Sequence, residues 1–250
     1  MKTTEKLQNG MACTERVLFL VSFFVLLLFF AAELSGFWHH CGVRHSAPWR
    51  LLLALAICAL FYCGGVLHSK RNPQSRVRFF LMVLFFLLYL YLIVSFTLLD
   101  PSLGRGSDSV YTDFAHRHRE YAARFVNLRP LQSIWKVYIQ GLLGGYLHPY
   151  YVLLNLLGNI CVFAPMAYFL PLFFKAQKRF FVFLLTMILT TLTVEGLQFV
   201  LTVGSCDVDD LILNVGGAML TYVIFRIPSV SRFLARLTAP RMRIKSTPWE

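Results

Sequence analysis

The sequence predicts an all-α fold: a polytopic membrane helix bundle with about six transmembrane helices and an interfacial helix in a long third loop. Hydrophobic residues make up 57% of the 250-residue chain and charged residues only 14%, whereas a soluble domain carries about 25% charged residues. The mean hydropathy is +0.62. The apolar residues also gather into runs long enough to cross a hydrocarbon core of about 30 Å. We therefore expect a multi-pass protein of the cell membrane, surrounded by membrane lipids.

The six predicted spans cover residues 17–34, 51–67, 79–99, 150–174, 180–203 and 211–227. The first run resembles a signal peptide in its position, but it exceeds the usual apolar region of about 7–15 residues and no small-residue cleavage site follows it. A retained anchor is therefore favoured. The fourth run contains Pro165 and Pro171, which a membrane helix tolerates because neighbouring helices satisfy the freed carbonyl groups.

The polar residues divide the chain into three parts. Residues 1–78 are predicted to form an anchor region with two plain apolar spans, residues 79–227 a domain with four spans and the third loop, and residues 228–250 a basic tail. In the second half of that loop, 131–147, apolar residues recur at helical spacing, which predicts a helix at the membrane interface. These apolar residues are Leu131, Ile134, Trp135, Tyr138 and Leu142.

The distribution of Lys and Arg predicts the orientation. With six spans, the side that holds both termini carries 16 of the 24 Lys and Arg residues, and the opposite side carries 8. Basic residues accumulate on the cytoplasmic side, so both termini are predicted to be cytoplasmic and the third loop to face outward. The formal net charge of +12 is explained by basic residues beside lipid headgroups.

The same charge provides little support for a nucleic-acid partner, because no basic, aromatic-interleaved nucleic-acid-binding fold is evident. No metal-ligand spacing occurs among the Cys and His residues, and no cofactor is predicted. The segment 231–237 of the tail has the pattern of a short amphipathic helix lying on the membrane surface.

Asn and Gln side chains occur only in the last three predicted spans. Asn155 and Asn159 lie four residues apart on one face of the fourth span, and Glu195 and Gln198 lie three apart on the fifth. A charged group within hydrocarbon costs about 2.5 kcal/mol or more, so it marks a candidate functional site. Asp207, Asp209 and Asp210 come just before the sixth span, and Asn214 lies within it. Their matching depth predicts that six of these side chains converge on one cavity in the outer half of the bundle: Asn155, Asn159, Glu195, Gln198, Asp210 and Asn214.

A purely structural interpretation competes with this one. Asp207 suits an N-cap, with Asp210 as its capping-box partner, and acids in the first turn complement the helix dipole. Asn155 and Asn159 could serve as hydrogen-bonding contacts between helices, and Gly216-Gly217 could permit close helix approach. Glu195 is harder to explain in this way, because Gln would serve as well without the cost of ionisation.

These residues, with Phe163, Pro165 and Asn127-Leu128-Arg129-Pro130, resemble the pattern of VanZ-like membrane proteins over residues 79–225. The resemblance implies a cell-envelope protein, because founding members are associated with low-level resistance to the glycopeptide antibiotic teicoplanin. Many members carry an Arg shortly before the Asp block, where this chain has Gly204 and Ser205. Arg129 is the nearest candidate substitute.

Three functions are consistent with the pattern. The first is a protein that binds a lipid, a lipid-linked headgroup or a glycopeptide-related ligand. The second is an intramembrane enzyme acting on a lipid-linked substrate, with Glu195 as the candidate catalytic general acid or base. The third is a small transporter or structural scaffold. The predicted ligand contacts are Asn155, Asn159, Glu195, Gln198, Asp207, Asp209, Asp210, Asn214 and Arg129.

Overall fold

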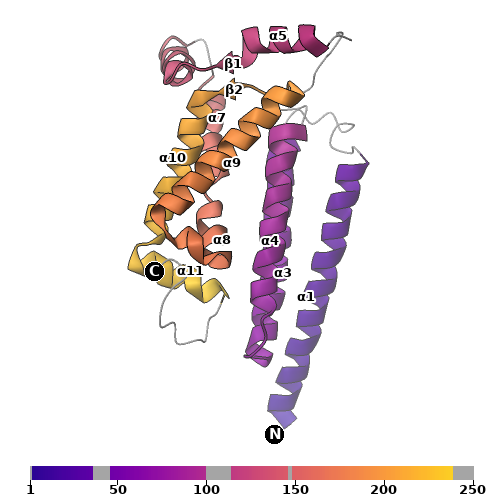
Figure 1. The fold of residues 1–250 in the computed structure, drawn as a ribbon. Coiled ribbons are helices and arrows are strands. Elements are labelled where there is room, and N and C mark those ends of the chain that lie inside the picture. The colour runs from indigo at the N-terminus through magenta and orange to yellow at the C-terminus, as the bar shows by residue number, and fades with distance from the viewer. Residues whose placement is uncertain (1, 36–45, 100–113, 146–147, 239–250) are drawn as a thin grey trace. The chain divides into compact units, whose positions relative to one another are not determined.

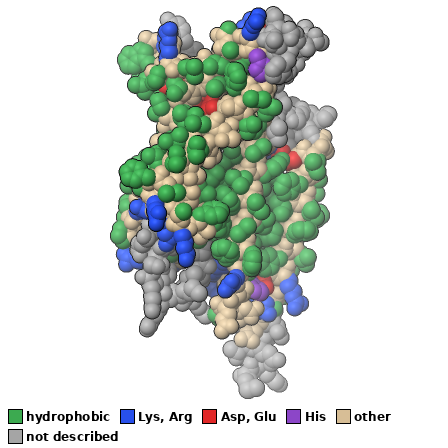
Figure 2. All heavy atoms as spheres, viewed as in Figure 1, with side chains coloured by type: hydrophobic (Ala, Val, Ile, Leu, Met, Phe, Trp, Pro, Cys, Tyr) green, Lys and Arg blue, Asp and Glu red, His purple; other side chains and the backbone are tan. Residues whose placement is uncertain are grey.

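The computed structural model describes residues 2–35, 46–99, 114–145 and 148–238, and it confirms the all-α class (Figure 1). Within these residues, six helices are long and apolar enough to cross a membrane, one for each predicted run. They are Gly10–Leu34, Trp49–Arg71, Val77–Leu98, Asn155–Phe173, Phe180–Leu201 and Val208–Phe225. Hydrophobic side chains cover the flanks of the helices, and Lys and Arg gather toward helix ends (Figure 2).

The chain divides into two compact units, with the main boundary between Leu92 and Ile93. The first unit comprises α1 (Lys2–Leu34), α3 (Ser46–Arg71) and most of α4 (Val77–Val94). The second unit contains the remaining helices, up to Ala235. The sequence-based domain boundaries at residues 78 and 227 stay a prediction.

Two ion pairs join α1 to α3 within the first unit. Glu33 binds Arg50 through both carboxylate oxygens, at 2.6 and 2.7 Å, and also accepts the Tyr91 hydroxyl. In the first half of α1, Glu15 pairs with Arg71 at 2.6 Å. Glu15 and Glu33 thus each meet a cation on α3, as expected where an unpaired charge would face hydrocarbon.

The second unit is built around α10, which packs against α7, α8 and α9. Its elements are η1 (Ser95–Leu99), α5 (Phe114–Phe125), β1 (Val126–Asn127), η3 (Ile134–Gln140), α6 (Gly141–Leu143), α7 (Pro149–Val162), α8 (Met166–Phe173), η4 (Lys175–Lys178), α9 (Phe180–Leu201), β2 (Cys206–Asp207), α10 (Val208–Phe225) and α11 (Pro228–Thr238). The fourth predicted run is two helices, α7 and α8, because Pro165 has no N–H and interrupts the backbone ladder between them.

The helices α7 and α10 approach each other closely at Gly217. A Cβ atom there would lie 1.9 Å from the carbonyl oxygen of Ile160, so only glycine fits. Gly216, its neighbour, has nothing within 4 Å of the corresponding position. The expected close approach therefore depends on the second glycine of the pair.

The third loop contains the predicted helix in a shorter form. Helical residues run without a break from Gln132 to Leu143, through the π-helical η3 and the short α6. Leu131 lies before η3 with a φ of 62°, in the left-handed region. A continuous helix cannot include that backbone conformation. The surface segment of the tail is longer than predicted, because α11 begins at Pro228 and ends at Thr238.

Candidate functional site

The third loop is attached to the start of α10 by a two-residue parallel strand pair. In this pair Val126 lies opposite Cys206 and Asn127 opposite Asp207. Two residues per strand provide only a few backbone hydrogen bonds, so side chains must hold the junction. The acidic residues at the start of α10 supply these side-chain contacts.

Asp209 is fully buried and binds the backbone of the loop. Its Oδ1 accepts the N–H of Leu131, and its Oδ2 accepts the N–H groups of Ser133, at 2.7 Å, and Ile134, at 3.0 Å. Helices begin with N–H groups that lack an intrahelical partner. Asp209 therefore satisfies the first turn of η3 and holds Leu131 in its left-handed conformation.

Asp207 binds side chains of the same loop. One carboxylate oxygen accepts from the Asn127 amide at 3.0 Å, and the other accepts from the Ser133 hydroxyl. The first oxygen also accepts the N–H of Asp209 at 2.9 Å, which makes Asp207 the N-cap of α10. The predicted N-cap is thus confirmed, although the carboxylate also joins two segments 80 residues apart in sequence.

Glu195, on α9, has 8% of its surface exposed and lies beside the same junction. Its carboxylate accepts the N–H of Asp207 at 3.1 Å. It also hydrogen-bonds the thiol of Cys206, in β2, and burial together with this carboxylate raises the pKa of that thiol above its usual value. Glu195 thus contacts both residues of β2 at the entry to α10.

The predicted ligand contacts do not all converge. Asn159 donates to Asp210, which joins α7 to α10. Gln198 is buried but donates to the backbone carbonyl of Thr97 in η1, at 3.1 Å. Asn155 is exposed on α7 and makes no hydrogen bond to a described residue. The structure therefore groups the acids and Asn159 around the start of α10, with Gln198 and Asn155 contributing elsewhere.

Asn214 lies one turn beyond Asp210 on α10 and is 6% exposed. Its amide oxygen is buried and has no hydrogen-bond partner in the described part of the chain. A buried polar group without a partner costs about 1–3 kcal/mol. Within the described structure, Asn214 therefore does not hold helices together by hydrogen bonding.

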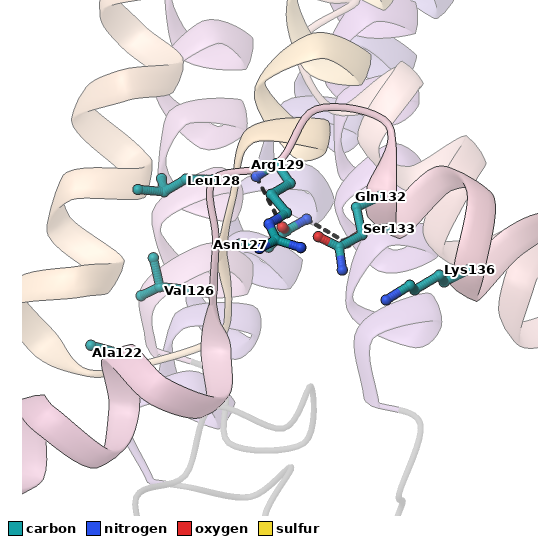
Figure 3. Close-up of a pocket in the computed structure, with 8 residues that line it drawn as sticks. All are labelled: Ala122, Val126, Asn127, Leu128, Arg129, Gln132, Ser133 and Lys136. Carbon is teal, nitrogen blue, oxygen red and sulfur yellow. Dashed lines mark hydrogen bonds between the residues drawn. The ribbon is translucent and has the colours of Figure 1, made fainter.

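A cavity of about 590 Å³ opens beside the junction, lined by the loop (Figure 3). Arg129 and Lys136 direct their charged groups toward it, and Asn127, Gln132 and Ser133 provide polar atoms. Neither cation pairs with a carboxylate among the described residues, and both side chains are exposed. Asp207 and Asp209 thus bind the loop, whereas Arg129 and Lys136 face the cavity without a carboxylate partner among the described residues.

Sequence reasoning identified Arg129 as a site residue but missed Gln132, Ser133 and Lys136. Lys136 lies outside the apolar stripe of the predicted loop helix, and this position was the only feature of the sequence that could have indicated it. Ser133 carried no signal, since its partner Asp207 lies 74 residues away. In the described residues, no cluster of three or more His, Cys, Asp or Glu has the arrangement of a metal site.

The exposed side of this loop is strongly apolar. Leu128, Leu131, Trp135 and Leu143 each leave more than half of their side-chain surface exposed. Apolar and Trp side chains next to cations are typical of segments at the membrane interface. This composition is consistent with contact between the loop and lipid headgroups.

Comparison with known proteins identifies the family of this chain. No curated protein and no solved structure matches this chain. The sequence model of the VanZ/LLP1 family matches residues 86–230, which include the third loop, the acidic junction, α9 and α10. The chain belongs to the VanZ/LLP1 family of membrane proteins.

Proposed function

We propose that this VanZ/LLP1 protein binds the phosphate-bearing headgroup of a lipid or lipid-linked molecule, without converting it. The supporting observation is the cavity of about 590 Å³ that presents Arg129 and Lys136 beside amide and hydroxyl groups. A guanidinium binds phosphate oxygens in a bidentate manner, and an ammonium group adds a second positive charge. A ligand with a phosphate group matches both cations.

The surroundings of the cavity favour a lipid over a soluble phosphate compound. The lining residue Leu128 is 74% exposed, and the neighbouring Leu131 and Trp135 are 58% and 56% exposed. An acyl or polyprenyl chain attached to the headgroup would cover such apolar surface. Binding of the protein to such a lipid would in turn alter the access of a glycopeptide antibiotic, such as teicoplanin, to the cell envelope.

The binding test uses purified protein in phosphatidylcholine nanodiscs that contain a polyprenyl phosphate as the probe. We expect Arg129→Gln and Lys136→Gln each to weaken retention of the probe about tenfold, because each removes one charge-assisted contact of about 1.5–3 kcal/mol. Arg124→Gln is the matched control, since Arg124 is an exposed cation of the same segment outside the cavity lining. Equal retention by all four proteins would contradict the proposal.

A second candidate, an intramembrane enzyme with Glu195 as general acid or base, draws support from the burial of that carboxylate beside Cys206. Mass spectrometry of the lipids after incubation separates the two candidates. Conversion of the probe by wild type and its loss in Glu195→Gln would favour the enzyme. Binding without conversion would favour the first proposal over both the enzyme and the scaffold. Teicoplanin susceptibility of cells expressing wild type or Arg129→Gln then tests the link to resistance.

A further inference from the structure

The first unit contains a separate polar cavity, outside the residues that match the family. Its volume is about 300 Å³, and its lining comes from the early part of α1 and the end of α3. The lining residues are Gln8, Met11, Lys70, Arg71 and Asn72. The candidate membrane span of α1 begins at Gly10 and that of α3 ends at Arg71. The cavity therefore lies at a boundary between apolar span and polar chain.

Four of the five lining side chains are hydrogen-bond donors with free capacity. Lys70, Gln8 and Asn72 make no side-chain hydrogen bond to a described residue, and all three are exposed. Arg71 uses its Nη1 to bind Glu15 at 2.6 Å, which leaves its remaining N–H groups available. Such a cavity suits a ligand with several oxygen acceptors.

The local charge is positive. Glu15 is the nearest described acid in contact with this end of α3, and it is already paired with both Arg71 and His68. Lys70 keeps an uncompensated charge, and Arg76 follows in the short connection to α4. Arg78 binds the Ser69 hydroxyl at 3.1 Å and so adds another cation at the end of α3. An anion is therefore favoured over a neutral or cationic ligand.

We propose that this cavity binds the phosphodiester headgroup of an anionic phospholipid from the adjacent leaflet. Lys70 and the free N–H groups of Arg71 hold the phosphate, and the amides of Gln8 and Asn72 bind the hydroxyl groups of a glycerol headgroup. The bound lipid bridges the start of α1 and the end of α3. It thereby acts beside the Glu15–Arg71 pair that joins the same two helices.

Native mass spectrometry on the full-length protein tests this site. The protein is released from vesicles of phosphatidylcholine with phosphatidylglycerol, and the lipids that stay bound are counted. We expect wild type to retain phosphatidylglycerol at least five times more often than phosphatidylcholine. Lys70→Gln and Asn72→Ala should each remove most of that preference without changing the thermal midpoint, because both side chains are exposed. Lys175→Gln, an exposed cation of the second unit, should leave the preference unchanged.

A second arm distinguishes a lipid from a soluble phosphate compound. Glycerol 3-phosphate and inorganic phosphate are added before release, and neither should displace phosphatidylglycerol. Displacement by either would overturn the lipid assignment, as would an unchanged preference in both Lys70→Gln and Asn72→Ala. Arg129→Gln should have no effect on this preference, so a failure here is separate from a failure of the proposed headgroup site in the third loop.

Discussion

The carboxylate of Asp209 binds the backbone N–H of Leu131, a residue 78 positions earlier in the chain. Leu131 has a left-handed backbone with a φ of 62°, a conformation that costs a non-glycine residue about 1–2 kcal/mol. The same carboxylate also binds the N–H groups of Ser133 and Ile134. An acid at the start of one membrane helix thus determines the conformation of the loop that carries Arg129 and Lys136.

We expect Asp209→Ala to release this loop. The change leaves three backbone N–H groups without their acceptor, at about 1–3 kcal/mol for each group that stays buried. Hydrogen exchange of residues 129–140 should become at least tenfold faster, with little change in α9. Glu120→Gln is the control and should leave exchange unaltered, because this acid of α5 makes no hydrogen bond or ion pair to a described residue. Unchanged exchange in Asp209→Ala would mean that the strand pair and the contacts of Asp207 hold the loop without Asp209.

Gly217→Ala should strongly destabilise the packing of α7 against α10. The added Cβ would lie 1.9 Å from the carbonyl oxygen of Ile160, so the helices must separate. Overpacking of this kind costs about 1–3 kcal/mol or more. Heat-induced loss of the monodisperse peak in detergent measures the effect. Gly216→Ala is the matched control, since nothing lies within 4 Å of its added methyl group; equal stability of the two variants would contradict the close approach.

The pKa and the alkylation rate of the Cys206 thiol depend on the charge of Glu195. Burial and the negative carboxylate both raise the pKa of the thiol, so less thiolate forms at a given pH. Glu195→Gln removes the charge while keeping an oxygen that accepts the N–H of Asp207. We expect the pKa of Cys206 to fall and its alkylation at pH 8 to become several times faster, because the thiolate is the nucleophile. The measurement uses protein in which the other five cysteines are replaced by Ala.

The same Glu195→Gln protein should fold, insert and keep its thermal stability, since shape and hydrogen-bonding capacity are preserved. If the protein needs the charge or the proton of Glu195, this variant should lose its cellular phenotype. A stable Glu195→Gln protein with a full phenotype would assign Glu195 to packing alone. An unchanged alkylation rate of Cys206 would instead contradict the contact between the two side chains.

Asn214→Leu distinguishes packing from ligand contact. The buried amide oxygen has no partner in the described residues, so replacing it by an apolar group of similar size should raise stability by about 1 kcal/mol. Thermal unfolding in detergent measures the change. A fall in stability would show that the amide is engaged in the folded protein. Asn159→Leu is the contrast, and it should lower stability because it leaves Asp210 without its amide donor.

Cysteine labelling from outside intact cells tests the orientation. We expect an impermeant maleimide to reach Ser205→Cys, which is exposed at the turn between α9 and β2, and positions in residues 100–113. Positions beyond Arg226 should react only after the membrane is permeabilised, because 16 of the 24 Lys and Arg residues lie on that side. Labelling of the tail in intact cells would reverse the predicted orientation.

The sequence by itself determined the class of the protein and its six spans, because the length of an apolar run is a local property that a membrane selects directly. It also identified Asp207 as the N-cap of α10 and the glycine pair as a point of close approach, since capping and small side chains act over a few residues. The acids at the start of α10 were recognisable as a cluster for the same reason.

Tertiary structure alone decided what these groups contact. Periodicity within a helix predicts which face a side chain occupies, but the partner comes from a segment that can be 80 residues away, as Asn127 is from Asp207. Gln198 shares its helix with Glu195 yet binds Thr97, and Asn155 shares its face with Asn159 yet is exposed. The loop that lines the cavity with Arg129 and Lys136 is likewise bound by Asp209, which lies 78 residues after Leu131. Such long-range pairing leaves no periodic signal in a sequence.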